Sequence, residues 1–225
     1  MKFLGCGSAF NPVLGNTSAY FTRENSLFLI DAGESVFKNL FEKELLKEYE
    51  EIYILITHAH ADHVGSLASI ISYTYYVLEK KVVVIHPNDT LIGLLKKMGV
   101  GQETYVYEQK ERLTVNGIVI DAVTVKHAAD MECFGYIIQI QDDRIFYSGD
   151  SYELPRKVVE EFMDGRIQLI YQDTAEFETG RLSHCPLKTL EKEIPAEHRN
   201  RVYCMHFTND FTEKISEKGF RYVEV

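Results

Sequence analysis

Four side chains of the kinds that bind metal ions fall within six residues of this sequence: His58, His60, Asp62 and His63. They directly follow residues 52–56, an almost wholly apolar stretch that predicts a strand buried on both faces. Placing so many polar groups beside a buried strand costs free energy unless a cation coordinates them. A string of this kind also rarely arises by chance, so we favour a metal site over a solvated polar loop.

The spacing of these four side chains predicts two adjacent half-sites. Residues i and i+2 at the end of a strand project to the same side, so His58 and His60 can share one ion. Asp62 and His63, past the turn, can face a second ion. Each half-site then needs further ligands from elsewhere in the chain.

Three more candidate ligands stand where predicted strands end. Functional residues collect at such ends, because the loops there reach a common edge supported by a rigid sheet. Taken alone, each of these residues is more often an ordinary polar side chain than a ligand. They are His127, Asp150 and His206.

The elements that must position these residues alternate between strands and helices. Two halves, each with a sheet that carries helices on one outer face, imply an α/β (α+β) fold built as a four-layer αββα sandwich. The predicted strands are residues 2–4, 18–22, 27–30, 52–56, 82–85, 118–125, 133–141, 144–147, 169–172 and 201–206, and the predicted helices are residues 34–49, 66–78, 90–98, 155–164 and 186–193.

The length of 225 residues suits one domain, or two intimately packed halves, with a core that needs no disulfides. The four cysteines are scattered, without a Cys-x-x-Cys pair, which favours buried thiols in a reducing cytosol over metal ligands. No apolar run reaches the length of a membrane span, and no signal-like stretch develops near residue 1. We therefore expect a soluble cytoplasmic protein.

The formal net charge of −10 argues against a broad nucleic-acid surface, because a phosphate backbone is held mainly by clustered lysines and arginines. A small anionic substrate is still allowed. Two divalent ions would place positive charge at one spot, whatever the sign of the surface around it.

With these candidate ligands in this order along the chain, the sequence resembles the metallo-β-lactamase superfamily, and within it the ribonuclease Z-like branch of phosphodiesterases. The match covers nearly the whole chain. Besides the histidine motif it includes a glycine-rich opening at residues 3–9, an Asn-Thr-Ser turn at residues 16–18 and the sequence Asp-Ala-Gly-Glu at residues 31–34.

The resemblance implies a dinuclear metal centre, with zinc the first choice and manganese, iron or nickel also accepted by such ligands. His58, His60 and His127 then correspond to ligands of one metal. Asp62, His63 and His206 correspond to ligands of the other, with Asp150 bridging both. A bridging water would lose its proton near neutral pH and attack phosphorus, and Asp62 would help to orient it.

Two departures from ribonuclease Z bear on the substrate. The long basic tRNA-binding arm between the positions of His127 and Asp150 is replaced by a stretch no longer than a β-hairpin. The His-Glu-Ala-Thr motif of that family, whose histidine assists catalysis, is matched here by Gln-Asp-Thr-Ala at residues 172–175. His184 is our candidate for contacting the phosphate or protonating the leaving oxygen, and a surface histidine that caps a helix near Pro186 is an equal alternative.

Other side chains carry weaker signals. Arg181 could bind phosphate, although a lone arginine is more often simply solvated. Tyr73, Tyr75 and Tyr76 could stack on a base, but at helical spacing they more often belong to a core or a dimer contact. His86 ends a predicted strand without matching a ligand motif, so we interpret it as structural.

The leading hypothesis is a dinuclear metal-dependent phosphodiesterase that hydrolyses a small phosphodiester such as a cyclic nucleotide and forms a homodimer. The alternatives are a tRNA 3′-processing endoribonuclease, a carboxylic ester or lactone hydrolase of the same fold and, outside enzymes, a metal-dependent nucleotide-binding sensor.

Overall fold

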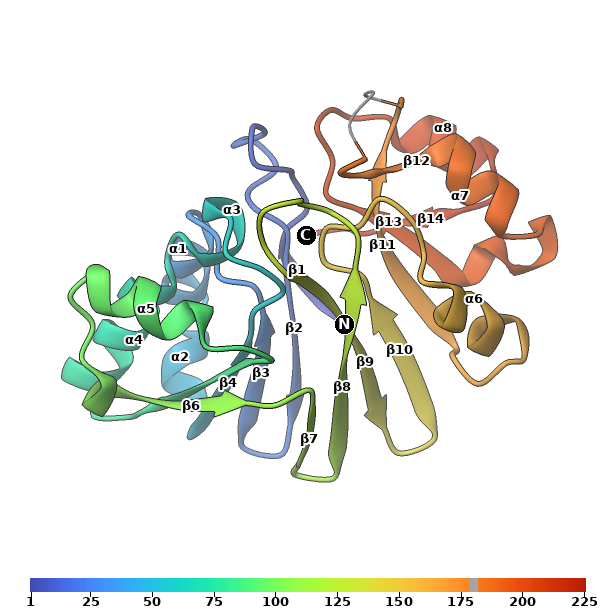
Figure 1. The fold of residues 1–225 in the computed structure, drawn as a ribbon. Coiled ribbons are helices and arrows are strands. Elements are labelled where there is room, and N and C mark those ends of the chain that lie inside the picture. The colour runs from blue at the N-terminus through green and yellow to red at the C-terminus, as the bar shows by residue number, and fades with distance from the viewer. Residues whose placement is uncertain (179–181) are drawn as a thin grey trace. The chain divides into compact units, whose positions relative to one another are not determined.

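A computed structural model describes residues 1–178 and 182–225. The chain divides into two compact units, Met1–Glu111 together with Val225, and Arg112–Glu224. Each unit contains one β-sheet and its own helices (Figure 1). Two separate sheets with helices confirm the expected mixture of α and β structure.

The first unit is built on a six-stranded sheet in the order β1-β2-β3-β4-β5-β6, antiparallel from β1 to β3 and parallel from β3 to β6. Its helices gather on one side of the sheet (Figure 1). The strands are β1 (Lys2–Gly5), β2 (Ser18–Arg23), β3 (Ser26–Ile30), β4 (Glu51–Leu55), β5 (Val82–His86) and β6 (Tyr105–Gln109), and the helices are α1 (Val36–Glu42), α2 (Leu45–Glu48), α3 (Ala61–Val64), α4 (Leu67–Tyr76), α5 (Thr90–Lys97) and the 3-10 helix η1 (Gln102–Thr104).

The central strands of this sheet are almost entirely buried. Every residue of β3 is buried, and so is all of β4 after Glu51. Apolar side chains from the sheet and from α1, α4 and α5 form one core cluster, as continuous apolar strands of a parallel sheet require. The rigid end of β4 is therefore the support on which the histidine motif begins.

The second unit is built on an eight-stranded sheet in the order β14-β13-β11-β10-β9-β8-β7, with β12 paired to β11. Its helices also lie together on one side (Figure 1). The strands are β7 (Arg112–Val115), β8 (Ile118–Val125), β9 (Cys133–Ile140), β10 (Asp143–Tyr147), β11 (Leu169–Ala175), β12 (Cys185–Pro186), β13 (Val202–Met205) and β14 (Arg221–Tyr222), and the helices are α6 (Arg156–Met163), α7 (Leu187–Glu193), α8 (Thr212–Glu217) and the 3-10 helix η2 (Ala196–Arg201).

One predicted helix, residues 34–49, is wrong in its length. The structure ends α1 at Glu42 and starts α2 at Leu45, because Glu44 between them takes a left-handed backbone conformation with φ of 56°. Phe41, which the apolar periodicity places on the buried face, is half exposed at this break. The prediction from periodicity therefore continues the helix through this turn, because no glycine or proline marks the turn in the sequence.

The cysteines agree with the expectation of buried thiols, since Cys6, Cys133, Cys185 and Cys204 all lie in the interior. Among the described residues, every helix falls short of the length and apolarity that a membrane span would need.

Candidate metal centre

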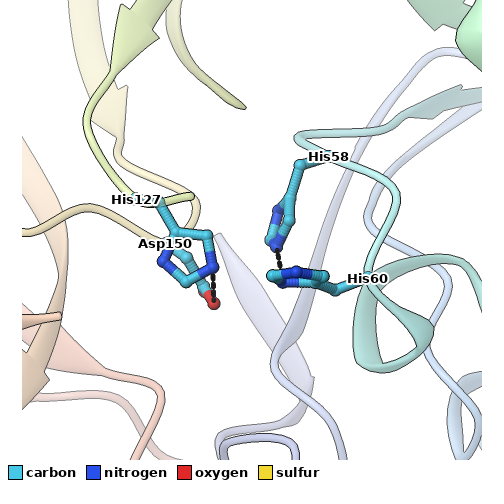
Figure 2. A group of neighbouring side chains, drawn as sticks. All are labelled: His58, His60, His127 and Asp150. Carbon is cyan, nitrogen blue, oxygen red and sulfur yellow. Dashed lines mark hydrogen bonds and ion pairs between the residues drawn. The ribbon is translucent and has the colours of Figure 1, made fainter. Parts of the chain in front are cut away.

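The histidine motif begins at His58, three residues after the end of β4, and its first pair of side chains converges. Nε2 of His58 lies 2.9 Å from Nδ1 of His60, as the dashed line between them in Figure 2 marks. His58 is buried, and Nδ1 on the other side of its ring lies 3.1 Å from the Thr57 hydroxyl. Two ring nitrogens within hydrogen-bond distance of one another are placed to share one proton or one cation.

The second pair of the motif lies on the short helix α3. Nε2 of His63 is 3.3 Å from a carboxylate oxygen of Asp62, and both side chains are buried. The first pair therefore lies before α3 and the second within it, and the rings of His58 and His63 lie close together, with centroids 4.1 Å apart.

Asp31 orients the second pair. Its carboxylate accepts hydrogen bonds from Nδ1 of His63, at 2.8 Å, and from the backbone N–H of Thr57, also at 2.8 Å. The Asp31 backbone takes a left-handed conformation with φ of 63°, and its side chain is completely buried. With Nδ1 held in this way, Nε2 of His63 faces Asp62.

Asp31 received no role from the sequence, although it belongs to the Asp-Ala-Gly-Glu segment. The signal was a carboxylate placed directly after a buried strand. The glycine of this segment has a packing reason, because a Cβ on Gly33 would lie 2.0 Å from the backbone oxygen of Asp62. The backbone N–H of Ala32 donates to the oxygen of His63, so the segment and the motif are bonded together.

In the second unit, Asp150 lies between two predicted ligands. One of its oxygens is 3.6 Å from Nε2 of His127, the pair drawn in Figure 2, and the other is 3.3 Å from Nε2 of His206. Asp150 follows Gly149, which has a positive φ of 59°, and His206 itself has φ of 67°. Left-handed backbone at a histidine is uncommon and is typical of functional sites.

The other ring nitrogens of these two histidines also have acceptors. Nδ1 of His127 donates to the backbone oxygen of Ser183 at 2.7 Å. Nδ1 of His206 lies 3.4 Å from a carboxylate oxygen of Asp173. His63, His127 and His206 therefore share one arrangement, in which Nδ1 faces a protein oxygen and Nε2 faces a carboxylate.

This arrangement is the one that metal-binding histidines use, since an acceptor on one nitrogen fixes the tautomer that leaves the other for the ion. Imidazole nitrogens and carboxylates are also the donor types that zinc and similar divalent ions bind. The residues present in each unit therefore fit a divalent metal.

His184 lies beside Asp150 and His206 in the second unit. Its Nδ1 donates to Asp173 at 2.7 Å and lies 4.0 Å from Asp150, and its ring stacks on His206 with centroids 5.1 Å apart. Asp150, Asp173, His184 and His206 thus offer ligand atoms within 4.8 Å of one another. The alternative of a helix cap is wrong, because α7 begins after Pro186 without a side-chain cap.

The charge state of His184 is set by two opposing effects. Burial lowers the pKa of the imidazole, but the attraction and the hydrogen bond of Asp173, with help from Asp150, outweigh burial, and the pKa is raised above its ordinary value. His184 therefore holds a proton more readily than an isolated histidine. Asp173 was not predicted as a site residue; only its place in the segment matched to a catalytic motif pointed to it.

The structure distinguishes between the residues that carried weaker signals in the sequence. His86 is buried and its Nδ1 pairs with the backbone oxygen of Ile56 at 2.8 Å, as a structural histidine would. Tyr73 packs edge-on against Phe37 with ring centroids 5.5 Å apart, whereas Tyr76 is 70% exposed. Arg181 lies outside the described residues.

The model of one protein family, described as anti-Pycsar protein Apyc1, matches residues 1–223. The chain belongs to the Apyc1 family. A curated Apyc1 relative from Bacillus phage BSP38 is 28% identical over 248 residues, covering 97% of this chain and 93% of the relative. Another, from Paenibacillus harenae, is 26% identical and covers 97% of this chain and 94% of its own length.

Solved structures show the fold of this Apyc1-family chain. The metallo-β-lactamase fold protein YhfI from Bacillus subtilis superimposes with a TM-score of 0.77 at 14% identity, over 99% of this chain and 93% of that one. Human tRNase Z, short form, gives a TM-score of 0.71 at 16% identity, over 100% and 95% of the two chains. The metallo-β-lactamase fold, expected from the resemblance, is confirmed.

The stretch between His127 and Asp150, all of which the structure describes, is as short as the sequence predicts. Between His127 and Asp150 the structure has only β9 and β10, which pair antiparallel from Asp143 opposite Ile140 to Tyr147 opposite Tyr136.

Proposed function

We propose that this Apyc1-family protein is a dinuclear metal-dependent phosphodiesterase that hydrolyses a small phosphodiester, a cyclic nucleotide in particular. The observation that carries the proposal is the placement of Asp150, whose two carboxylate oxygens face the Nε2 atoms of two different histidines. A carboxylate so placed suits a bridge between two ions.

The proposed ligands are the seven residues that the sequence predicts. One metal would be held by His58, His60 and His127, and the other by Asp62, His63 and His206, with Asp150 shared. Zinc is the first choice for this donor set, and manganese, iron or nickel would also be accepted. In this proposal, residues 1–225 act as one hydrolase domain.

Bound divalent ions would supply a Lewis acid for the phosphate oxygens and lower the pKa of a coordinated water. The Asp62 carboxylate accepts a hydrogen bond from the attacking water and orients it toward phosphorus. As the new P–O bond forms and the ester P–O bond breaks, the protonated His184 donates its proton to the leaving oxygen. Asp173 holds His184 in place and stabilises its charged form before the transfer.

Three features support a small substrate. The net charge is −10, the chain has a hairpin in place of a basic arm, and its family membership is consistent with a cyclic nucleotide. The ribonuclease alternative would require a basic surface to hold a polyphosphate chain. In a mobility-shift assay at physiological salt, we expect no stable complex with precursor tRNA.

The deciding experiment measures hydrolysis of a panel of cyclic mononucleotides, dinucleotides, lactones and precursor tRNA with added zinc or manganese. The proposal expects turnover of cyclic nucleotides but not of lactones or tRNA. Binding of a cyclic nucleotide without turnover would instead favour the sensor alternative.

The ligand assignment is tested with Asp62→Ala and His63→Ala. Each variant should lose activity on the preferred cyclic nucleotide by several orders of magnitude while its circular dichroism spectrum stays that of the parent. Retained turnover would refute the second metal site. A homodimer and a cytoplasmic location are further parts of the proposal, and the dimer is tested by light scattering at several protein concentrations.

A further inference from the structure

An exposed aromatic side chain lies on the connection that leads to His184. Phe177 comes two residues after the end of β11, and 66% of its surface is exposed. Leu182, at the other described end of the same connection, is equally exposed. Apolar and aromatic side chains commonly line the sites that bind small molecules.

The sheet places Phe177 within reach of the site in the same unit. Thr174 of β11 pairs with Cys185, the residue that follows His184. Phe177 is three residues beyond Thr174, and three extended residues span at most about 11 Å. The Cα of Phe177 therefore lies within about 11 Å of the Cα of Thr174, which pairs with the residue next to His184.

The segment beside Phe177 is anchored from a second side. The Glu176 carboxylate accepts a hydrogen bond from Nδ2 of Asn209 at 2.7 Å and forms an ion pair with Nζ of Lys214. Asn209 is only three residues after His206. The residue next to Phe177 is thus anchored to the chain segment that follows His206.

Lys214 also approaches the ring itself, with Nζ 5.1 Å from the centroid of Phe177. Glu176 balances the charge of this lysine, so the pair contributes little net attraction for phosphate. The segment instead presents the exposed aromatic ring of Phe177, and a nucleobase can bind such a ring by stacking on its face.

We infer that Phe177 is the stacking platform for the nucleobase of the substrate, held in position by the Glu176–Lys214–Asn209 cluster. This inference rests on the proposed function and adds a specificity residue to it. Stacking uses the π-face that every base has, so the platform accepts purine and pyrimidine substrates alike.

The test compares Phe177→Ala, Phe177→Leu and Phe177→Tyr in steady-state hydrolysis of purine and pyrimidine cyclic nucleotides. Loss of stacking should raise KM about 5- to 150-fold for both base types in the alanine variant, with kcat nearly unchanged. Leucine, which restores apolar volume without an aromatic face, should stay weak, and tyrosine should recover. Met163→Ala, which trims another exposed apolar side chain in the same unit, is the matched control.

A binding measurement keeps this test independent of turnover. By calorimetry, the Phe177→Ala variant should bind a nucleoside 5′-monophosphate more weakly than the parent, while ribose 5-phosphate, which lacks a base, should bind both equally. If the parent hydrolyses nothing but shows this base-dependent difference, the proposed function fails and the platform stands. Equal nucleotide affinity in parent and variant, or no nucleotide binding at all, overturns the platform.

Discussion

Asp173 contacts two histidines through its two oxygens, Nδ1 of His184 at 2.7 Å and Nδ1 of His206 at 3.4 Å. It also accepts a hydrogen bond from the backbone N–H of Ser151 at 3.0 Å. One buried carboxylate therefore holds the proposed proton donor and a proposed metal ligand in a fixed relation. These contacts give a structural reason for an acidic residue at this position.

The substitution Asp173→Asn should lower kcat/KM by about 100-fold, since a positioned general acid contributes on that scale. The direction of the pH effect follows from the raised pKa of His184. Its protonated form is present below that pKa and is lost as the pH rises through it, and removing the negative charge lowers the pKa. The alkaline limb of the pH profile of kcat/KM should therefore move to lower pH.

The control for this change is Asp164→Asn, which removes an exposed carboxylate that pairs with Arg166. Its pH profile should match that of the parent enzyme. An Asp173→Asn profile that keeps its alkaline limb in place would remove His184 from the role of proton donor.

Asp31 should act through metal affinity. The substitution Asp31→Asn removes the negative acceptor from Nδ1 of His63, and acceptors of this kind are worth about 10- to 100-fold in affinity. Competition with a chromophoric chelator measures the change. Thr57→Ser, which keeps the hydroxyl beside Asp31, should leave the affinity close to that of the parent; an equal loss there would point to general disruption.

The residues that spacing could identify are those whose types are rare and clustered. His58, His60, Asp62 and His63 stand out by their spacing, and the other three predicted ligands stand out by their places at the ends of predicted strands and by the resemblance. Asp31 and Asp173 could not be assigned in the same way, because a single carboxylate gains its role only from the histidine that folding brings to it.

At the scale of elements, the turn that supports the histidine motif depends on Gly33, which has no side chain. In Gly33→Ala the added Cβ would meet the backbone oxygen of Asp62 at 2.0 Å, so the turn or the motif must move. We expect a loss of about 1–3 kcal/mol in the free energy of unfolding, as for other overpacked sites. Denaturant unfolding measures it.

A second glycine provides the matched comparison. Gly93 lies within α5, and a Cβ there would meet nothing within 4 Å. Gly93→Ala should raise the free energy of unfolding by about 0.5–1 kcal/mol, because alanine loses less conformational freedom in a helix. Equal effects of the two substitutions would contradict the packing argument.

The elements that were predicted well are those with strong patterns, such as β4 and the paired strands β8, β9 and β10. The elements that were missed are short or polar. β6 is only partly buried, and β14 has two residues, so neither carries a hydrophobic period. The break between α1 and α2 was missed because the structure places a glutamate in left-handed backbone, which no local sequence rule marks.

For the whole molecule, the proposed centre makes stability depend on metal. Ions that bind only the folded chain stabilise it by about 2.7 kcal/mol at a concentration 100 times Kd. Chelation should therefore lower the unfolding temperature, and zinc should restore it. Asp62→Ala should show a smaller rise with zinc than the parent, and an unfolding temperature insensitive to chelator would count against the centre.

Each sheet uses strands from one stretch of chain, β1 to β6 before residue 110 and β7 to β14 after residue 111. During synthesis the whole first sheet has left the ribosome before most of the second has been translated. Because domains generally fold as units and the N-terminal one first, nascent chains can complete the first sheet early. The order of translation thus reduces the time for which apolar strands such as β3 and β4 stay exposed to other chains.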